Sequence, residues 1–252
     1  MNNLLKKTVL TLFIGLIMVM QSCNNNDPAL SDIKLEMKAT TALSTINPSG
    51  RLANTGLVFT EVVIGVTEIE FETFEEDEAE ESGEIEDADD DGEDDNEEIE
   101  FEGNYVVDLI AGTSNPPFGE AVIAPGIYEE MEIELSPILE GGITMFVAFD
   151  YTPDGAMEPV RYEYSTDAEM EYELEPEGGF ILDEGTLNQM LVLIDLDAMF
   201  ANVDLNTATA DTDGVVRING SSNADLAAQI ALNLGDVMEG GEDEDGDGEF
   251  DD

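Results

Sequence analysis

Strict alternation between apolar and charged residues is the feature of this sequence that most limits its possible folds. In residues 33–38, Ile, Leu and Met alternate with Lys and Glu. Four further stretches repeat the pattern, mostly with Glu as the charged residue: 68–72, 98–109, 130–135 and 169–174. Because successive side chains of a β-strand point to opposite faces of a sheet, this period of two predicts half-buried strands with a glutamate-lined, solvated face.

Two other stretches have apolar residues on both faces of a strand, as expected of strands that are buried on both sides. They are residues 142–151 (GITMFVAFDY) and 189–200 (QMLVLIDLDAMF), and the second is also compatible with a helix. Turn signals such as Pro153-Asp154-Gly155 separate the predicted strands at short intervals. The pattern therefore predicts an all-β protein, an antiparallel β-sandwich of roughly eight to ten strands.

One short C-terminal helix is predicted over residues 221–235, SSNADLAAQIALNLG. Ser222 or Asn223 is the expected N-cap, and Gly235 the expected end. An apolar stripe for the core is formed by Leu226, Ile230 and Leu234.

Composition removes several classes of function. The chain has 61 acidic and 7 basic residues among 252, a formal charge of −54, so we expect no nucleic-acid partner. There is no His and only one Cys, which excludes His-based catalysis, an internal disulfide and a thiolate zinc cluster. At 42% hydrophobic the chain can still form a core. We therefore expect a folded protein that is not an enzyme.

The N-terminus reads as a secretory leader that ends in a lipidation site. A short cationic start precedes a short apolar run, and the only cysteine, Cys23, follows Met20-Gln21-Ser22. This arrangement is similar to the lipobox of bacterial lipoproteins, although Met20 and Gln21 depart from its preferred residues. The alternative is an ordinary secretory leader with a chance cysteine.

These observations divide the chain into expected segments. We expect a lipoprotein signal peptide (1–22), a lipid-anchored tether (23–32), a β-sandwich domain (33–238) and an acidic tail (239–252). Within the domain, residues 75–98 read as a long, disordered acidic hairpin insert between strands near Phe71 and Ile99.

The order of several patterned stretches resembles a known kind of protein. EIEFEGNYVVDL (98–109), APGIYEEMEIEL (124–135), an apolar strand and a late SSNADL helix look like bacterial lipoproteins that carry an acidic β-sandwich domain of unknown function. The resemblance implies the fold, a membrane anchor and an address at the outer membrane or cell surface. It implies no mechanism.

Two acidic runs have the spacing of calcium loops, in which oxygen ligands occupy alternate positions around a glycine. In the insert, Asp87, Asp89 and Asp91 precede Gly92, followed by Glu93 and by Glu98 as the twelfth residue. In the tail, Asp243, Asp245 and Asp247 precede Gly248, with Asp251 at the ninth position and no twelfth. We expect weak calcium binding, with a dissociation constant on the order of 0.1–1 mM as in extracellular modules.

Three functions remain open from the sequence. The first is a lipid-anchored, non-catalytic extracytoplasmic protein that binds calcium weakly and faces an unknown protein or matrix partner. The second is a structural or interaction module without metal, whose acidic residues serve only solvation. The third is a carboxylate-dependent periplasmic hydrolase, for which Asp195 with Asp197, or Asp150 with Asp154, are the nominal pairs.

Overall fold

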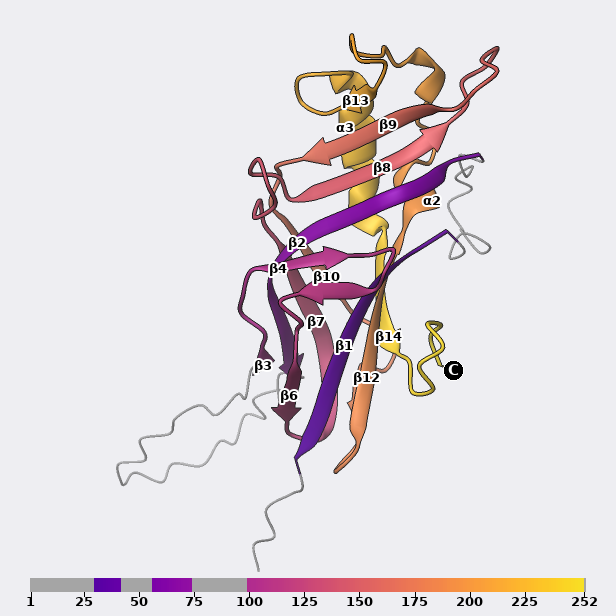
Figure 1. The fold of residues 1–252 in the computed structure, drawn as a ribbon. Coiled ribbons are helices and arrows are strands. Elements are labelled where there is room, and N and C mark those ends of the chain that lie inside the picture. Colours follow the sequence, from indigo (N-terminus) through magenta and orange to yellow (C-terminus); the bar gives the residue numbers. More distant parts are fainter. Residues whose placement is uncertain (1–29, 42–55, 74–98, 252) are drawn as a thin grey trace, which may run out of the picture.

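The computed structural model describes residues 30–41, 56–73 and 99–251, which form two β-sheets with helices near one end (Figure 1). The smaller sheet has the order β14-β12-β1-β6. Its strands are β1 (Ser31–Thr40), β6 (Glu120–Ile123), β12 (Leu187–Asp195) and β14 (Met238–Glu242). Cys23, the signal peptide, most of the tether and the insert 75–98 lie outside the described residues.

The larger sheet follows the order β10-β7-β2-β8-β9-β13. Its path consists of β2 (Val58–Thr73), β7 (Gly126–Leu135), β8 (Met145–Tyr151), β9 (Val160–Thr166), β10 (Met170–Leu174) and β13 (Val216–Ile218). Shorter strands pair alongside: β3 (Ile99–Glu100), β4 (Tyr105–Asp108), β5 (Thr113–Asn115) and β11 (Phe180–Leu182). Phe71 pairs with Ile99 across β2 and β3, so the strands that flank the acidic insert form the expected hairpin.

The all-β fold with one short C-terminal helix is confirmed, but the sheets are mixed rather than antiparallel throughout. β1 runs parallel to β12, from Asp32 opposite Leu187 to Thr40 opposite Asp195, and β13 runs parallel to β9. β12 lies between β14 and β1 and is buried at every position from Met190 to Asp195. Continuous apolar sequence is typical of strands covered on both faces, as parallel strands commonly are.

The core lies between the sheets, and the alternating sequence places its side chains there. Ile33, Leu35 and Met37 of β1 point inward, as do Met131, Ile133 and Leu135 of β7. An aromatic cluster adds Phe59, Phe149, Tyr162, Tyr164 and Phe200.

The stretch 189–200 resolves into a strand followed by a helix. β12 ends at Asp195, whose Oδ1 accepts a hydrogen bond from the backbone N of Ala198 at 3.0 Å. This carboxylate caps α2 (Leu196–Met199). A 3-10 turn, Leu205–Thr207, follows before β13.

The predicted C-terminal helix is α3 (Ala224–Asn233), with Leu226 and Ile230 buried as expected. Asn223 occupies the N-cap position but does not cap the helix, which corrects the prediction. Its backbone is left-handed, with φ +49°, and its side chain bonds Thr209 and the carbonyl of Arg217. Gly235 does not end the helical path, because a 3-10 turn continues over Leu234–Asp236.

The acidic tail is part of the folded unit rather than a separate segment. β14 crosses the expected boundary at residue 238 and pairs with β12, with Ile194 opposite Met238 and Met190 opposite Glu242. β1 likewise begins two residues before the expected start of the domain. Among the described residues, no helix has the length and apolar character needed to cross a bilayer.

Candidate functional site

The best-formed candidate site is the turn after β14, residues 243–251, here called the C-terminal acidic loop. Carboxylate oxygens of Asp243, Asp245 and Asp247 lie within 4.8 Å of one another. The alternate spacing seen in the sequence therefore becomes a convergent group of three acidic side chains. Distances of this order allow one cation to contact all three residues.

Asp243 is the unusual member of this group. Its residue is only 4% exposed, although two of its neighbours in the group are exposed. Oδ2 accepts a hydrogen bond from the backbone N of Gly248 at 3.1 Å, while Oδ1 is buried and has no hydrogen-bond partner among the described residues. A buried carboxylate oxygen without a partner is destabilising, so a cation or a hydrogen-bond donor such as water would stabilise this atom.

The backbone of the loop holds the acidic side chains in a tight turn. Asp245 Oδ1 accepts from the N of Asp247 at 3.1 Å, and Asp247 Oδ1 accepts from the N of Glu249 at 2.9 Å. Gly248, the sixth residue counted from Asp243, has φ +87°, a conformation that residues other than glycine rarely adopt. Calcium loops of the helix-loop-helix kind also place glycine at the sixth position for the sharp turn.

The loop is fixed to the smaller sheet. The N of Asp243 donates to the carbonyl of Gln189 at 2.9 Å, and Nε2 of Gln189 donates to the carbonyl of Glu244 at 3.2 Å. At the far end, the N of Asp251 donates to the carbonyl of Glu242 at 2.9 Å, and the Asp251 carboxylate accepts from the N of Glu244. The loop therefore closes on itself and on β12.

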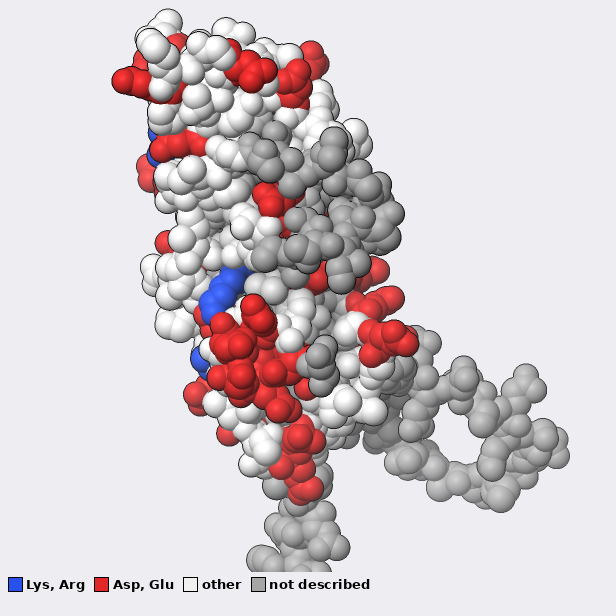
Figure 2. Space-filling view, turned by 90° about the vertical axis from the view of Figure 1, so that its right-hand side faces the viewer, with Lys and Arg blue, Asp and Glu red and all other residues white. Residues whose placement is uncertain are grey.

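A lysine stands beside this acidic loop. A methyl group added at Gly248 would lie 3.1 Å from Nζ of Lys38, which also forms an ion pair with Glu36 at 2.9 Å. Figure 2 views the side of the molecule on which the C-terminus lies in Figure 1, and acidic side chains gather there beside a basic one. A bound cation would therefore meet some repulsion from Lys38.

The predicted metal residues thus have different outcomes. Asp243, Asp245 and Asp247 come together, and Asp251 closes the loop through a hydrogen bond but lies outside the group of three. The other predicted metal residues lie outside the described part of the chain, as does Cys23, the predicted lipidation site: Asp87, Asp89, Asp91, Glu93 and Glu98.

A second acidic feature, the glutamate face, was not predicted as a unit. It lies on the outer side of neighbouring strands of the larger sheet and consists of Glu68, Glu70 and Glu72 on β2, Glu130, Glu132 and Glu134 on β7, and Glu171 and Glu173 on β10. Register puts these side chains directly opposite one another. Glu132, for example, pairs with Glu70 on one side and Glu173 on the other.

Burial and the crowding of glutamates on this face raise the pKa of two of them. Burial, followed by the charges of Glu72 and Glu173, raises the pKa of Glu130 from 4.5 to about 7. Burial and then the charge of Glu171 also raise the pKa of Glu132. Oxygens of Glu72, Glu130 and Glu132 lie within 4.8 Å of one another. These three side chains form a second group that can hold an ion, on the surface of a sheet rather than in a closed loop.

Of the residues nominated for a hydrolase, Asp195 has a structural role in the described fold. Asp195 caps α2, and burial followed by the charge of Asp195 raises the pKa of Asp197. Asp154 donates its backbone N to Asn206 Oδ1 at 2.8 Å. A separate hollow of about 480 Å³ beside the C-terminal acidic loop has Asp183, Glu242 and Glu244 in its wall. There Glu242 Oε1 accepts from the backbone N of Ile181 at 2.9 Å, so it too has a structural role.

Comparison of the chain with models of protein families, with curated proteins and with solved structures found no match. The function of this chain must therefore be inferred from its own sites.

Proposed function

We propose that this chain is a lipid-anchored extracytoplasmic protein, without catalytic activity, that binds calcium weakly through its acidic loops. The C-terminal acidic loop is the principal site. The observation that carries the proposal is the buried Oδ1 of Asp243, which lacks a partner in the described structure and belongs to the convergent group with Asp245 and Asp247.

The chemistry of the loop favours calcium over other metals. Its side-chain ligands are hard carboxylate oxygens, and the chain has no His that a transition metal would prefer. Calcium accepts six to eight oxygens in flexible geometry, whereas magnesium requires a near-ideal octahedron. The exposed Asp245 and Asp247 leave room for water in the remaining positions.

Location and partners follow from the N-terminal sequence and the charge. The leader and Cys23 support attachment to the outer membrane or cell surface by lipid. Such a compartment supplies calcium at the concentration that a weak site needs. The strongly acidic chain suits an unidentified protein or matrix partner that is basic or bridged by calcium, and not nucleic acid.

Calorimetric titration with calcium at fixed high ionic strength tests the proposed site. Wild-type protein should bind with a dissociation constant on the order of 0.1–1 mM. Asp245→Asn combined with Asp247→Asn should weaken binding at least about tenfold, since coordinating charge sets the affinity of such loops. Glu249→Gln is the matched control, because it removes a charge from the same loop but not from the group of three.

Two outcomes would reject calcium binding at this site. One is equal affinity in the wild type and the double variant, and the other is equal weakening by Glu249→Gln. If sodium chloride reproduces every effect of calcium, the alternative of a structural or interaction module without metal is correct.

Metabolic labelling with palmitate tests the anchor. Wild-type protein should carry label and partition with membranes, because multiple acyl chains hold a protein firmly. Cys23→Ala should lose both properties, and equal labelling of the two forms would reject lipidation.

A further inference from the structure

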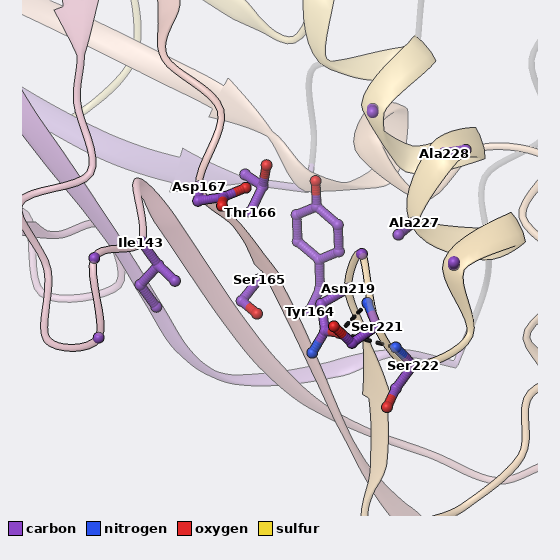
Figure 3. Close-up of a pocket in the computed structure, with 15 residues that line it drawn as sticks. Ile143, Tyr164, Ser165, Thr166, Asp167, Asn219, Ser221, Ser222, Ala227 and Ala228 are labelled. Carbon is purple, nitrogen blue, oxygen red and sulfur yellow. Dashed lines mark hydrogen bonds between the residues drawn. The ribbon is translucent and has the colours of Figure 1, made fainter.

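A hollow of about 610 Å³ opens between the end of β9 and one face of α3 (Figure 3). Its walls come from four segments: residues 141–143 before β8, 164–167 at the end of β9, 219–222 between β13 and α3, and the first turns of α3. Its volume is typical of sites for small molecules. We call it the α3 pocket.

Several hydrogen-bonding groups in the α3 pocket have no partner among the described residues. The hydroxyls of Ser165, Ser221 and Ser222 form no hydrogen bond within the described part of the chain. Asn219 Oδ1 accepts from the backbone N of Ser221 at 2.9 Å and of Ser222 at 3.0 Å (Figure 3). These two bonds orient the amide and leave Nδ2 available as a donor in the pocket wall.

The opposite wall is apolar and is made mostly of small side chains. Ala224, Ala227, Ala228 and Ala231 follow one another at helical spacing on a single face of α3, and Ile143 adds to the apolar lining. Methyl side chains leave space for a ring to lie against the helix. Figure 3 shows the ring of Tyr164 between β9 and this face of α3.

Charge selects among ligand classes. Among the described residues that line the pocket, Asp167 is the single charged one, and none is Lys or Arg. An anion would be repelled by a chain of formal charge −54. A cation would find one exposed carboxylate, which contributes little in water.

We propose that the α3 pocket binds a neutral saccharide unit. A sugar presents hydroxyls that both donate and accept, which match the three serine hydroxyls and Asn219 Nδ2. The Asp167 carboxylate can accept hydrogen bonds from two neighbouring sugar hydroxyls, which adds direction more than strength at this exposed position. The C–H face of the sugar ring packs on the alanine wall. This site shares no residue with the C-terminal acidic loop, and its operation needs no calcium.

Ligand-observed saturation-transfer NMR on the full chain tests the proposal. The probes are the methyl glycosides of glucose, galactose and mannose and N-acetylglucosamine, each measured in the presence of a calcium chelator. At least one probe should show transfer with millimolar affinity. Ser165→Ala and Ser222→Ala should each weaken binding about threefold to tenfold, the effect of one lost hydrogen bond.

A pair of helix variants locates the binding. Ala228→Trp fills the pocket and should abolish transfer, whereas Gln229→Trp, at the next exposed position and outside the lining, should not. The chain has no Trp of its own, so each variant also supplies a single fluorescent reporter of folding.

Transfer that survives Ala228→Trp would overturn the assignment, as would the absence of transfer from all four probes. Inorganic phosphate that displaces a bound sugar would show that the pocket is an anion site instead. Because the chelator removes calcium, failure here and failure of the calcium site are distinguishable.

Discussion

Replacing Glu132 with glutamine should stabilise the protein. Glu132 is half-buried on β7, directly opposite Glu70 of β2 and Glu173 of β10. Like charges that face each other across strands are unfavourable, and Glu132→Gln removes two such pairs without changing side-chain size.

The expected gain can be worked from the register. Opposite Cβ atoms on neighbouring strands lie roughly 5 Å apart, where two unit charges in water repel by about 0.8 kcal/mol. Two pairs give about 0.5–1.5 kcal/mol once the mobility of the side chains is allowed for. In a domain of this size that corresponds to about 1–6 °C in melting temperature. Most of the gain should vanish in 1 M salt, where the Debye length is about 3 Å.

Urea unfolding at pH 8, at low and at high salt, measures this gain. Glu129→Gln is the matched control, because Glu129 is exposed on the same strand and is paired with no glutamate among the described strands. Equal stabilisation by the two substitutions would mean that net charge alone is responsible. Lower stability of Glu132→Gln at low salt would refute the electrostatic reasoning.

Three further results are expected. Because the pKa of Glu130 is raised from 4.5 to about 7, the stability contributed by its protonated form is present below about pH 4.5 and is lost as pH rises through 7. The urea midpoint of Glu130→Gln should therefore vary less than that of the wild type between these pH values. Phe200→Ala should cost about 3–5 kcal/mol in urea unfolding, since Phe200 is fully buried with its ring 4.8 Å from that of Phe149; a cost below about 1 kcal/mol would contradict this packing. Lys38→Met should tighten calcium binding by roughly threefold to tenfold in calorimetry, because it removes a positive charge beside the C-terminal acidic loop, and weaker binding would place calcium elsewhere.

Local sequence rules predicted much of the fold. Period-two alternation identified the inward residues of β1, β7 and β10, because one buried face strongly specifies that pattern. Residues 189–200 stayed ambiguous, since buried strands and helices share an apolar composition. The strand changes to a helix at Asp195, whose side chain caps the helix. The sequence pattern did not identify this cap.

What depends on strand partners could not be predicted. The parallel pairing of β1 with β12 joins residues more than 150 positions apart. The glutamate face requires the order β10-β7-β2, which alternation within each strand does not encode. Asn223 failed as a helix cap because its side chain bonds Thr209 and Arg217, which tertiary structure brings near.

In the candidate site, too, some features are set by local sequence and others by distant strands. Asp243, Asp245 and Asp247, which alternate along the chain before Gly248, converge in the structure because a tight turn is a local property; their binding of calcium stays a prediction. The burial of Asp243 depends on the distant strand β12, to which its backbone bonds through Gln189. That burial is the feature that distinguishes this run from a solvated acidic tail.

Anomalous diffraction from crystals of the full chain grown with calcium, or with a lanthanide in its place, tests the calcium proposal most directly. We predict one strong peak within about 2.3–2.6 Å of carboxylate oxygens of Asp243, Asp245 and Asp247, including the buried Oδ1 of Asp243. A map with no peak at the C-terminal acidic loop, or with peaks only over the glutamate face, would contradict it.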